Sequence, residues 1–198
     1  MGFKSGLAWF DQDTGAVQKI CDFEEGLNTR ANDGKCDGAG NWVIGGYSNN
    51  HRDDKLNITG LWRLNAKDMS FEEILDYRFR CSNTIAFSPD GGSMYFCDTP
   101  TREIHKFKYS SSGKLSQKSL HWRMAPKDQG GPDGATVDAQ GGLWEAHAGN
   151  WKVVRHRPGI NSEKSSFFWT FFVMGFFIIM ELGKRTLTTG RSCATAMA

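Results

Sequence analysis

The stretch "NTIAFSPDGGSMYFCD", residues 83–98, has the pattern of two short strands joined by a tight turn. The apolar run "TIAF" leads to "SPDGG", which is rich in turn-forming residues, and the second apolar run "SMYFCD" follows. The chain continues with "REIHKFKY", a Ser-Gly turn and "LSQKSLHWRM", which have the composition of two further strands. This part of the sequence therefore predicts a small sheet of four strands.

The same pattern occurs twice more, at intervals of about fifty residues. One copy is "NDGKCDGAGNWVIGG" and the other is "DGATVDAQGGLWEAH". The first residue of each copy, its leader, is Asn32, Asn83 or Asp133. A small polar residue follows after five positions, a glycine after eight and an aromatic residue soon after: Asp37, Ser88 and Asp138; Gly40, Gly91 and Gly141; Trp42, Tyr95 and Trp144. A repeat of this length with four strands per unit predicts an all-β fold made of β-propeller blades.

The leaders have a common position in such a fold. Because the blades of a propeller surround a central channel, we expect Asn32, Asn83 and Asp133 to meet near one end of it. Amide and carboxylate oxygens suit Ca²⁺, Mg²⁺ or Mn²⁺, and Zn²⁺ is a further candidate. Arg30 lies two residues before the first leader and could hold substrate hydroxyls or an oxyanion. The alternative is that the leaders only cap turns, where Asn and Asp are common, and that Arg30 is structural.

Composition and motifs exclude several other functions. The 198 residues carry a net charge of +2 with scattered basic residues, which argues against a nucleic-acid partner. No GxSxG elbow, P-loop or GxGxxG motif occurs, and the five cysteines include no CxxC pair. The first fifteen residues lack the apolar run of a secretory signal, so we expect a cytoplasmic protein.

The three copies, in their order and spacing, resemble the signature stretches of the gluconolactonase, regucalcin and luciferin-regenerating-enzyme-like family. The matching stretches are "RANDGKCDGAGNWVIGG", "CSNTIAFSPDGGSMYFCDT" and "GGPDGATVDAQGGLWEAHAGN", and the resemblance covers residues 7–159. It implies a six-bladed β-propeller and metal-dependent hydrolysis of a small sugar lactone. Regucalcin is also a calcium-binding protein, so the alternative is a calcium-binding module without catalysis.

The resemblance also implies roles for individual residues. Asn83 matches a metal-ligand asparagine, although the family usually has glycine next and this chain has Thr84. Asp133 matches the aspartate that is both a metal ligand and the general base. Arg30 and Asn32 match the substrate-binding pair. The implied cofactor is a divalent cation: Ca²⁺, Zn²⁺, Mn²⁺ or Mg²⁺.

One expected ligand has no match in the chain. The family places its remaining metal ligand, a glutamate, near the beginning of the propeller, before the first copy. At about fifty residues per blade, residues 1–160 would make about three of the six blades. We therefore expect a partial propeller with low or absent lactonase activity.

The composition changes after residue 160, and residues 161–198 are predicted to form a separate hydrophobic and basic tail. Its apolar part, "FFWTFFVMGFFIIM" at residues 167–180, is shorter than the roughly 20 residues of a membrane-spanning helix. Three explanations are open: translated non-coding sequence, a short membrane or interfacial anchor, or a helix covering the open edge of the propeller. We favour the first over membrane contact, because the repeat is lost at this point.

Overall fold

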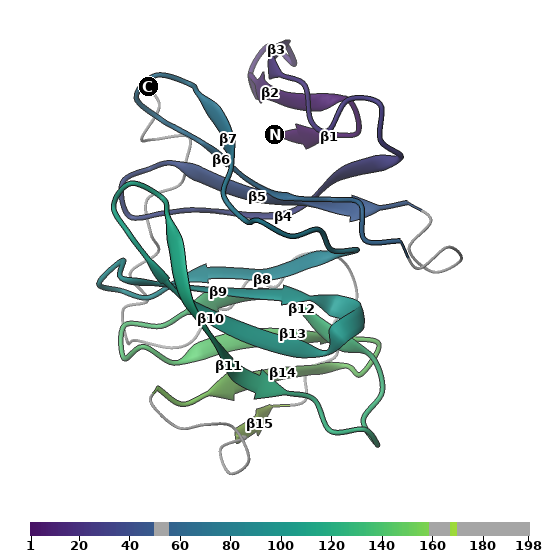
Figure 1. Ribbon diagram of the computed structural model, residues 1–198, viewed down its shortest axis with the longest axis vertical. Coiled ribbons are helices and arrows are strands. Elements are labelled where there is room, and N and C mark those ends of the chain that lie inside the picture. Colours follow the sequence, from purple (N-terminus) through teal and green to yellow (C-terminus); the bar gives the residue numbers. More distant parts are fainter. Residues whose placement is uncertain (50–55, 159–166, 170–198) are drawn as a thin grey trace.

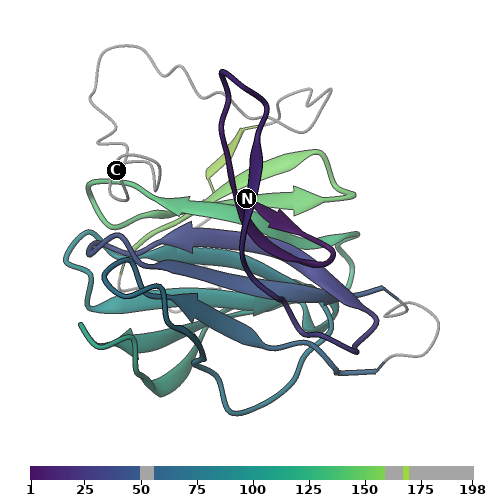
Figure 2. The same ribbon diagram turned by 90° about the horizontal axis from the view of Figure 1, so that it is seen from above.

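The computed structural model describes residues 1–49 and 56–158 and the backbone of residues 167–169. These residues form antiparallel β-sheets with one turn of 3-10 helix, η1 (Thr99–Thr101), and no α-helix among them. The sheets follow one another in chain order from the top to the bottom of Figure 1, and Figure 2 shows the same arrangement from above.

One sheet has three strands: β1 (Gly2–Phe3), β2 (Gly6–Phe10) and β3 (Val17–Cys21). The second contains β4 (Thr29–Cys36), β5 (Trp42–Ser48), β6 (Leu61–Leu64) and β7 (Phe71–Glu73). The third contains β8 (Ser82–Phe87), β9 (Ser93–Asp98), β10 (Glu103–Tyr109) and β11 (Leu115–Arg123). The fourth contains β12 (Gly131–Val137), β13 (Leu143–Ala148), β14 (Lys152–His156) and β15 (Phe167–Trp169).

Each sheet is a meander in which neighbours in the chain are hydrogen-bonded neighbours in space. The first strands of the four-stranded sheets lie next to one another, since β8 contacts both β4 and β12. Four-stranded meanders arranged around their first strands are propeller blades, so the predicted β-propeller fold is confirmed. The sheet β1–β3 was not predicted, because its residues lack the leader and turn pattern of the repeat.

The turns after the three first strands share one conformation. Gly40, Gly91 and Gly141 have φ angles of 87°, 69° and 81°, in the left-handed region that favours glycine. Each glycine N–H donates to the carbonyl of the residue three positions earlier, at 2.8–3.0 Å. This geometry explains why every copy has glycine eight positions after its leader.

The core lies between the sheets. Leu143 of the fourth sheet packs with Tyr95, Cys97 and Ile104 of the third, and all four are buried. The rings of Phe79 and Phe96 meet edge-on at 4.9 Å between the second and third sheets. Since each such side chain stabilises the fold by roughly 1.5–3 kcal/mol when buried, the interfaces hold the first strands in fixed relative positions.

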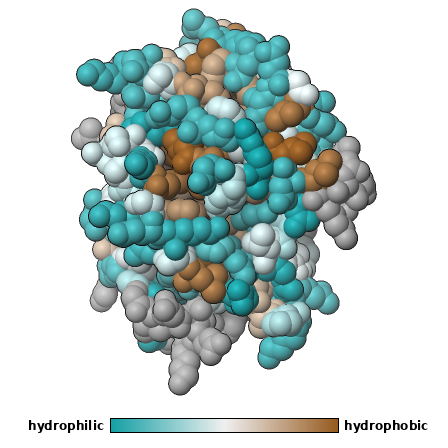
Figure 3. All heavy atoms as spheres, in the orientation of Figure 1, coloured by the Kyte–Doolittle hydropathy of each residue, from teal (hydrophilic) through white to brown (hydrophobic). Residues whose placement is uncertain are grey.

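Apolar groups also reach the surface. In Figure 3 they gather mainly in the upper half of the view, where the first two sheets lie. Phe3, Trp9, Phe10 and Val17 of the first sheet are exposed. None of the described residues belongs to a helix long and apolar enough to cross a membrane.

The predicted tail lies largely outside the described residues. Phe167–Trp169 form β15, which pairs with β14. Residues 170–180, the rest of the apolar stretch, are not described. The boundary at residue 160 and the three explanations of the tail stay predictions.

Candidate functional site

A β-bulge interrupts each first strand at or beside its leader. The pairing register shifts between Ala31 and Gly34 in β4, between Asn83 and Ala86 in β8, and between Pro132 and Ala135 in β12. Bulges bend a strand and re-aim its side chains, and they are common at the rims of barrels and beside active sites. The repeat therefore encodes the same interruption in three neighbouring strands.

The interruptions bring the three leaders together. The Asn32 Nδ2 donates to the Ser82 carbonyl at 2.8 Å and lies 3.5 Å from the Asn83 Oδ1. The side-chain amide of Asn83 in turn approaches the Asp133 Oδ1 to 3.0 Å. The three side chains are therefore neighbours in space, as predicted. The Asn32 and Asn83 side chains form hydrogen bonds to groups outside their own strands and do not cap the turns of their own hairpins.

The contact between Asn83 and Asp133 has two forms. With its nitrogen toward Asp133, the Asn83 amide donates to the carboxylate, and its oxygen accepts from the Thr99 hydroxyl at 2.8 Å. With its oxygen toward Asp133, two oxygens face each other at 3.0 Å with no proton between them. Exchanging the amide nitrogen and oxygen removes this contact between two acceptors, so the Asn83 nitrogen faces Asp133 in the chain without a bound cation.

Amide and carboxylate oxygens are ligands that hard cations take, so Asn83, with its amide turned, and Asp133 suit a divalent cation by their chemistry, but as an incomplete set of ligands. Within the described ranges, no group of three or more His, Cys, Asp or Glu side chains could hold a metal ion. The two oxygens would leave most coordination positions to water and substrate.

Asp133 is half-buried in β12. Burial raises the pKa of its carboxyl above the ordinary value, and the Gly134 N–H acts in the opposite direction. A carboxylate whose proton affinity is increased in this way is better suited to accept a proton near neutral pH than an exposed one.

A second carboxylate, Asp33, was not predicted as part of the site. Its Oδ2 accepts the Ile85 N–H at 2.9 Å, so it links β4 to β8. Burial raises the pKa of Asp33 to about 6, and the nearby charge of Asp133 acts in the same direction. The residue stands in the motif "NDG" directly after Asn32, but only the contact between sheets reveals its part.

Arg30 and Asn32 are in direct contact, and their predicted role in binding a substrate stays a prediction. The Arg30 Nη1 donates to the Asn32 Oδ1 at 2.9 Å and to the Ala31 carbonyl at 3.1 Å. The guanidinium carbon lies 4.1 Å from the centre of the Tyr47 ring. Tyr47 pairs with Arg30 across β4 and β5, and this aromatic support was missed because the pairing register was unknown.

Cys81 lies beside the two asparagines. Its Sγ is 3.6 Å from the Asn83 Nδ2 and 4.0 Å from the Asn32 Nδ2. Burial raises the pKa of the thiol to about 11, so it stays protonated at neutral pH. Cys81 thus lines the site beside the two asparagines as a protonated thiol.

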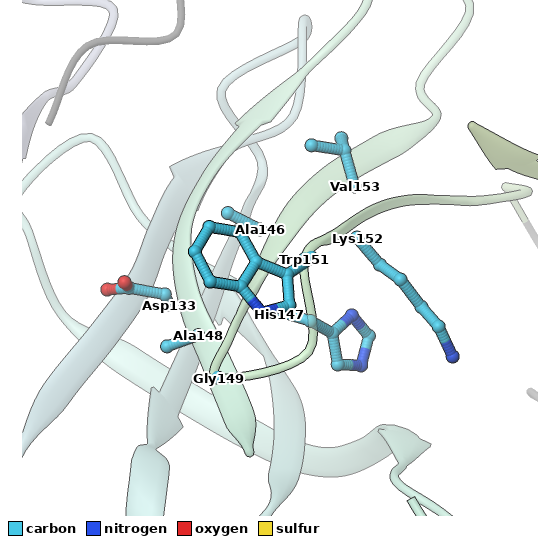
Figure 4. Close-up of a pocket in the computed structure, with 8 residues that line it drawn as sticks. All are labelled: Asp133, Ala146, His147, Ala148, Gly149, Trp151, Lys152 and Val153. Atoms are coloured by element: carbon cyan, nitrogen blue, oxygen red, sulfur yellow. The ribbon is translucent and has the colours of Figure 1, made fainter. Parts of the chain in front are cut away.

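A cavity of about 210 Å³ adjoins Asp133 (Figure 4). Its other lining residues are Ala146, His147, Ala148, Gly149, Trp151, Lys152 and Val153. In Figure 4 the carboxylate of Asp133 points away from His147 and Lys152. Burial lowers the pKa of His147 to about 4, so this histidine is neutral at pH 7. The polar contacts of the site thus lie on the Asn83 side of Asp133.

Comparison with known proteins places these features in a family. The model of the SMP-30/Gluconolactonase/LRE-like region matches residues 1–164. The chain is 39% identical to the L-arabinolactonase of Azospirillum brasilense over 165 residues, which is 83% of this chain and 54% of the relative. It is 31% identical to the regucalcin of Danio rerio over 77% of this chain and 50% of the relative.

A solved structure of a luciferin-regenerating enzyme has the same fold, with a TM-score of 0.72 at 24% identity. The alignment covers 81% of this chain and 55% of that enzyme. The chain thus spans about half the length of the curated relatives it matches. With the family model matching most of its length, the chain belongs to the SMP-30/gluconolactonase/LRE-like family.

Proposed function

We propose that the chain carries the metal- and substrate-binding residues of a sugar-lactone hydrolase. The observation that supports this most directly is the approach of Asn83 to the Asp133 Oδ1 at 3.0 Å, in the channel of a protein related to an L-arabinolactonase. Asn83 and Asp133 would hold a divalent cation. When bound, such a cation polarises a carbonyl and lowers the pKa of a water molecule.

The side chains have separate tasks in this proposal. Asp133 accepts a proton from the water that attacks the lactone carbonyl, since burial increases its affinity for a proton. Arg30 uses its remaining N–H groups to orient sugar hydroxyls, with its plane fixed by the Tyr47 ring. Asn32 holds the guanidinium through its Oδ1 and is itself held by the Ser82 carbonyl.

We propose further that hydrolysis by this chain alone is slow. Two protein oxygens bind a hard cation weakly, because affinity rises with the number and charge of the ligands. The chain also spans only about half the length of its lactonase relative.

Hydrolysis of a gluconolactone and an L-arabinolactone, with excess Zn²⁺, Mn²⁺ or Ca²⁺ and with EDTA, tests both proposals. We expect a slow reaction that a divalent cation stimulates and EDTA removes. A rate that EDTA leaves unchanged would contradict the metal-dependent mechanism. Rapid hydrolysis, at the roughly ten turnovers per second of an ordinary enzyme, would contradict the proposed impairment.

A calcium-binding module without catalysis is the second candidate. The similarity of the chain to the regucalcin of Danio rerio supports this candidate. Calcium binding without hydrolysis of either lactone at any metal concentration would support this candidate.

A further inference from the structure

We propose that two threonines, Thr84 of β8 and Thr99 of η1, are positioning residues for Asp133, an inference that rests on the proposed function. Their hydroxyls donate to two consecutive carbonyls of β12. Thr84 Oγ1 bonds the Asp133 carbonyl and Thr99 Oγ1 bonds the Pro132 carbonyl, each at 2.8 Å. The two bonds hold the main chain of β12 at the residue that carries the carboxylate.

Thr84 adopts a conformation that a β-branched residue rarely takes. Its φ is 59°, in the left-handed region, and its side chain is fully buried. Such a conformation is costly for threonine and persists only where surrounding contacts fix it. Because the hydroxyl of Thr84 reaches the Asp133 carbonyl, the strained residue provides a contact that a glycine could not make.

The bulge at Thr84 is also fixed from its other side. The next residue, Ile85, donates its N–H to the carboxylate of Asp33 in β4. The first strands of the three blades belong to separate sheets. Side-chain bonds at the Thr84 bulge therefore join β4, β8 and β12 at the level of the leaders.

Thr99 connects the position of β12 to the orientation of Asn83. A hydroxyl has one proton, so Thr99 can donate either to the Pro132 carbonyl or to an Asn83 oxygen. It donates to Pro132 when it accepts the Asn83 Nδ2, at 2.8 Å, which turns the Asn83 oxygen toward Asp133. That is the orientation in which both side chains present oxygen. Donation from Thr99 to the Pro132 carbonyl therefore goes with the orientation in which the Asn83 oxygen faces Asp133, and donation from Thr99 to Asn83 goes with the orientation in which the amide bonds Asp133.

The close packing of β12 against Thr99 supports this role. A Cβ added at Gly131 would lie 2.8 Å from the Thr99 Cγ2, so glycine is needed for the approach. Thr101, two residues further on, is a matched control. Its hydroxyl also donates to a carbonyl, that of Asp98 at 2.7 Å, but does not contact β12.

The test compares Thr84→Val and Thr99→Val with Thr101→Val in the full chain. The first measurement is amide hydrogen exchange of residues 131–137 in metal-free protein, and the second is Ca²⁺ affinity by calorimetry. We expect both test variants to exchange several-fold faster in this segment than the control and to bind Ca²⁺ about tenfold more weakly, with Thr84→Ser and Thr99→Ser close to wild type.

Thr84→Gly separates positioning from backbone strain. Glycine accepts the left-handed φ, so the strain is removed together with the hydroxyl, and exchange at 131–137 should still rise as in Thr84→Val. Exchange equal to that of Thr101→Val, or a failure of the serine variants to restore it, would overturn the proposal. If wild type binds no divalent cation, the proposed function fails, and the exchange measurement alone decides whether the threonines position Asp133.

Discussion

Asp133 and Asp138 lie five residues apart, one inside β12 and one in the turn that follows it, and their surroundings are opposite. Asp138 is buried and accepts hydrogen bonds from the Gly142 N–H, the Trp144 Nε1 and the Arg155 Nε at 2.7–2.8 Å. Burial alone would raise the pKa of Asp138, but these bonds outweigh it and hold the pKa below the ordinary value. Its negative charge is fully compensated, as a structural carboxylate requires.

The carboxyl of Asp133 has a raised pKa, in contrast to that of Asp138. Burial raises the pKa of its carboxyl, with the Gly134 N–H as the opposing hydrogen bond. One of its oxygens lies 3.0 Å from the side-chain amide of Asn83 in β8. The comparison teaches that, in the third copy of the repeat, the carboxylate at the turn is bonded within its own sheet, whereas burial raises the proton affinity of the carboxylate at the leader.

The largest expected effect is on hydrolysis, from Asp133→Asn. Loss of the base and of a charged ligand should reduce divalent-stimulated lactone hydrolysis by about 100-fold or more, while the melting temperature is kept. The matched variant Asp138→Asn should keep most of this activity at a temperature where it is folded. Unchanged hydrolysis in Asp133→Asn would refute its assignment as the base.

The next effect is on stability, from Asp138→Asn. Arg155 and the turn would lose their charged acceptor, so we expect the free energy of unfolding to fall by about 2–3 kcal/mol in urea titrations. Asp90→Asn, in the equivalent turn of the third sheet, is the control, because Asp90 is exposed. A loss as small as that of the control would mean that Asp138 is not the structural member of the pair.

Carboxyls with a raised pKa and carboxyls with a lowered pKa should change the free energy of unfolding in opposite directions as the pH rises. Asp33, like Asp133, has a raised pKa, about 6 against an ordinary 3.8. Between these values the folded chain keeps a proton that the unfolded chain has lost, so rising pH destabilises the fold. Relative to Asp33→Asn, the wild type should lose about 2 kcal/mol of its free energy of unfolding between pH 4 and pH 7.

Asp138 provides the contrast in the same titration. Its lowered pKa means that its contribution is complete above the ordinary pKa and is lost as the pH falls. Urea unfolding at intervals of one pH unit, in metal-free buffer, checks both signs. If the free energy of unfolding varies with pH in the same way in wild type and Asp33→Asn, the pKa of Asp33 is not raised in the folded chain.

The smallest effect is expected for Arg30→Lys. Lysine cannot keep both the contact with the Tyr47 ring and the bond to Asn32 in the same geometry. We expect the KM for the lactone to rise by roughly five- to tenfold with little change in the maximal rate. Arg123→Lys, at an exposed ion pair with Glu103, is the control. Equal KM values in the two variants would argue against a substrate contact at Arg30.

Local patterns were sufficient to predict the blades. The turn residues and strand periods of each copy are set by neighbours in sequence, so the first two strands of each copy, the outer strands of the third sheet and the approach of the leaders followed from spacing. Ser70 and Glu73 have the spacing of a helix-capping box, yet Phe71–Glu73 is a strand because it pairs with β6. The roles of 161–198 lie outside what the described residues test.

Contacts between sheets could not be predicted in the same way. Asp33, Tyr47 and Thr99 contribute to the site through partners in another strand or another blade. Their identities became apparent only when the register and the packing of neighbouring blades were known. The threonine at position 84, where the family usually has glycine, was visible in the sequence. Its structural role became apparent only from its φ angle and its hydrogen bond to the Asp133 carbonyl.

Calorimetric titration of the metal-free chain with Ca²⁺, Mn²⁺ and Zn²⁺ tests the central claim most directly, because it does not depend on catalysis. We predict one cation bound per chain by the wild type and by Asp138→Asn, and roughly tenfold weaker binding, or weaker still, by Asp133→Asn. Equal binding by wild type and Asp133→Asn, or no binding of any of the three cations by the wild type, would contradict the account.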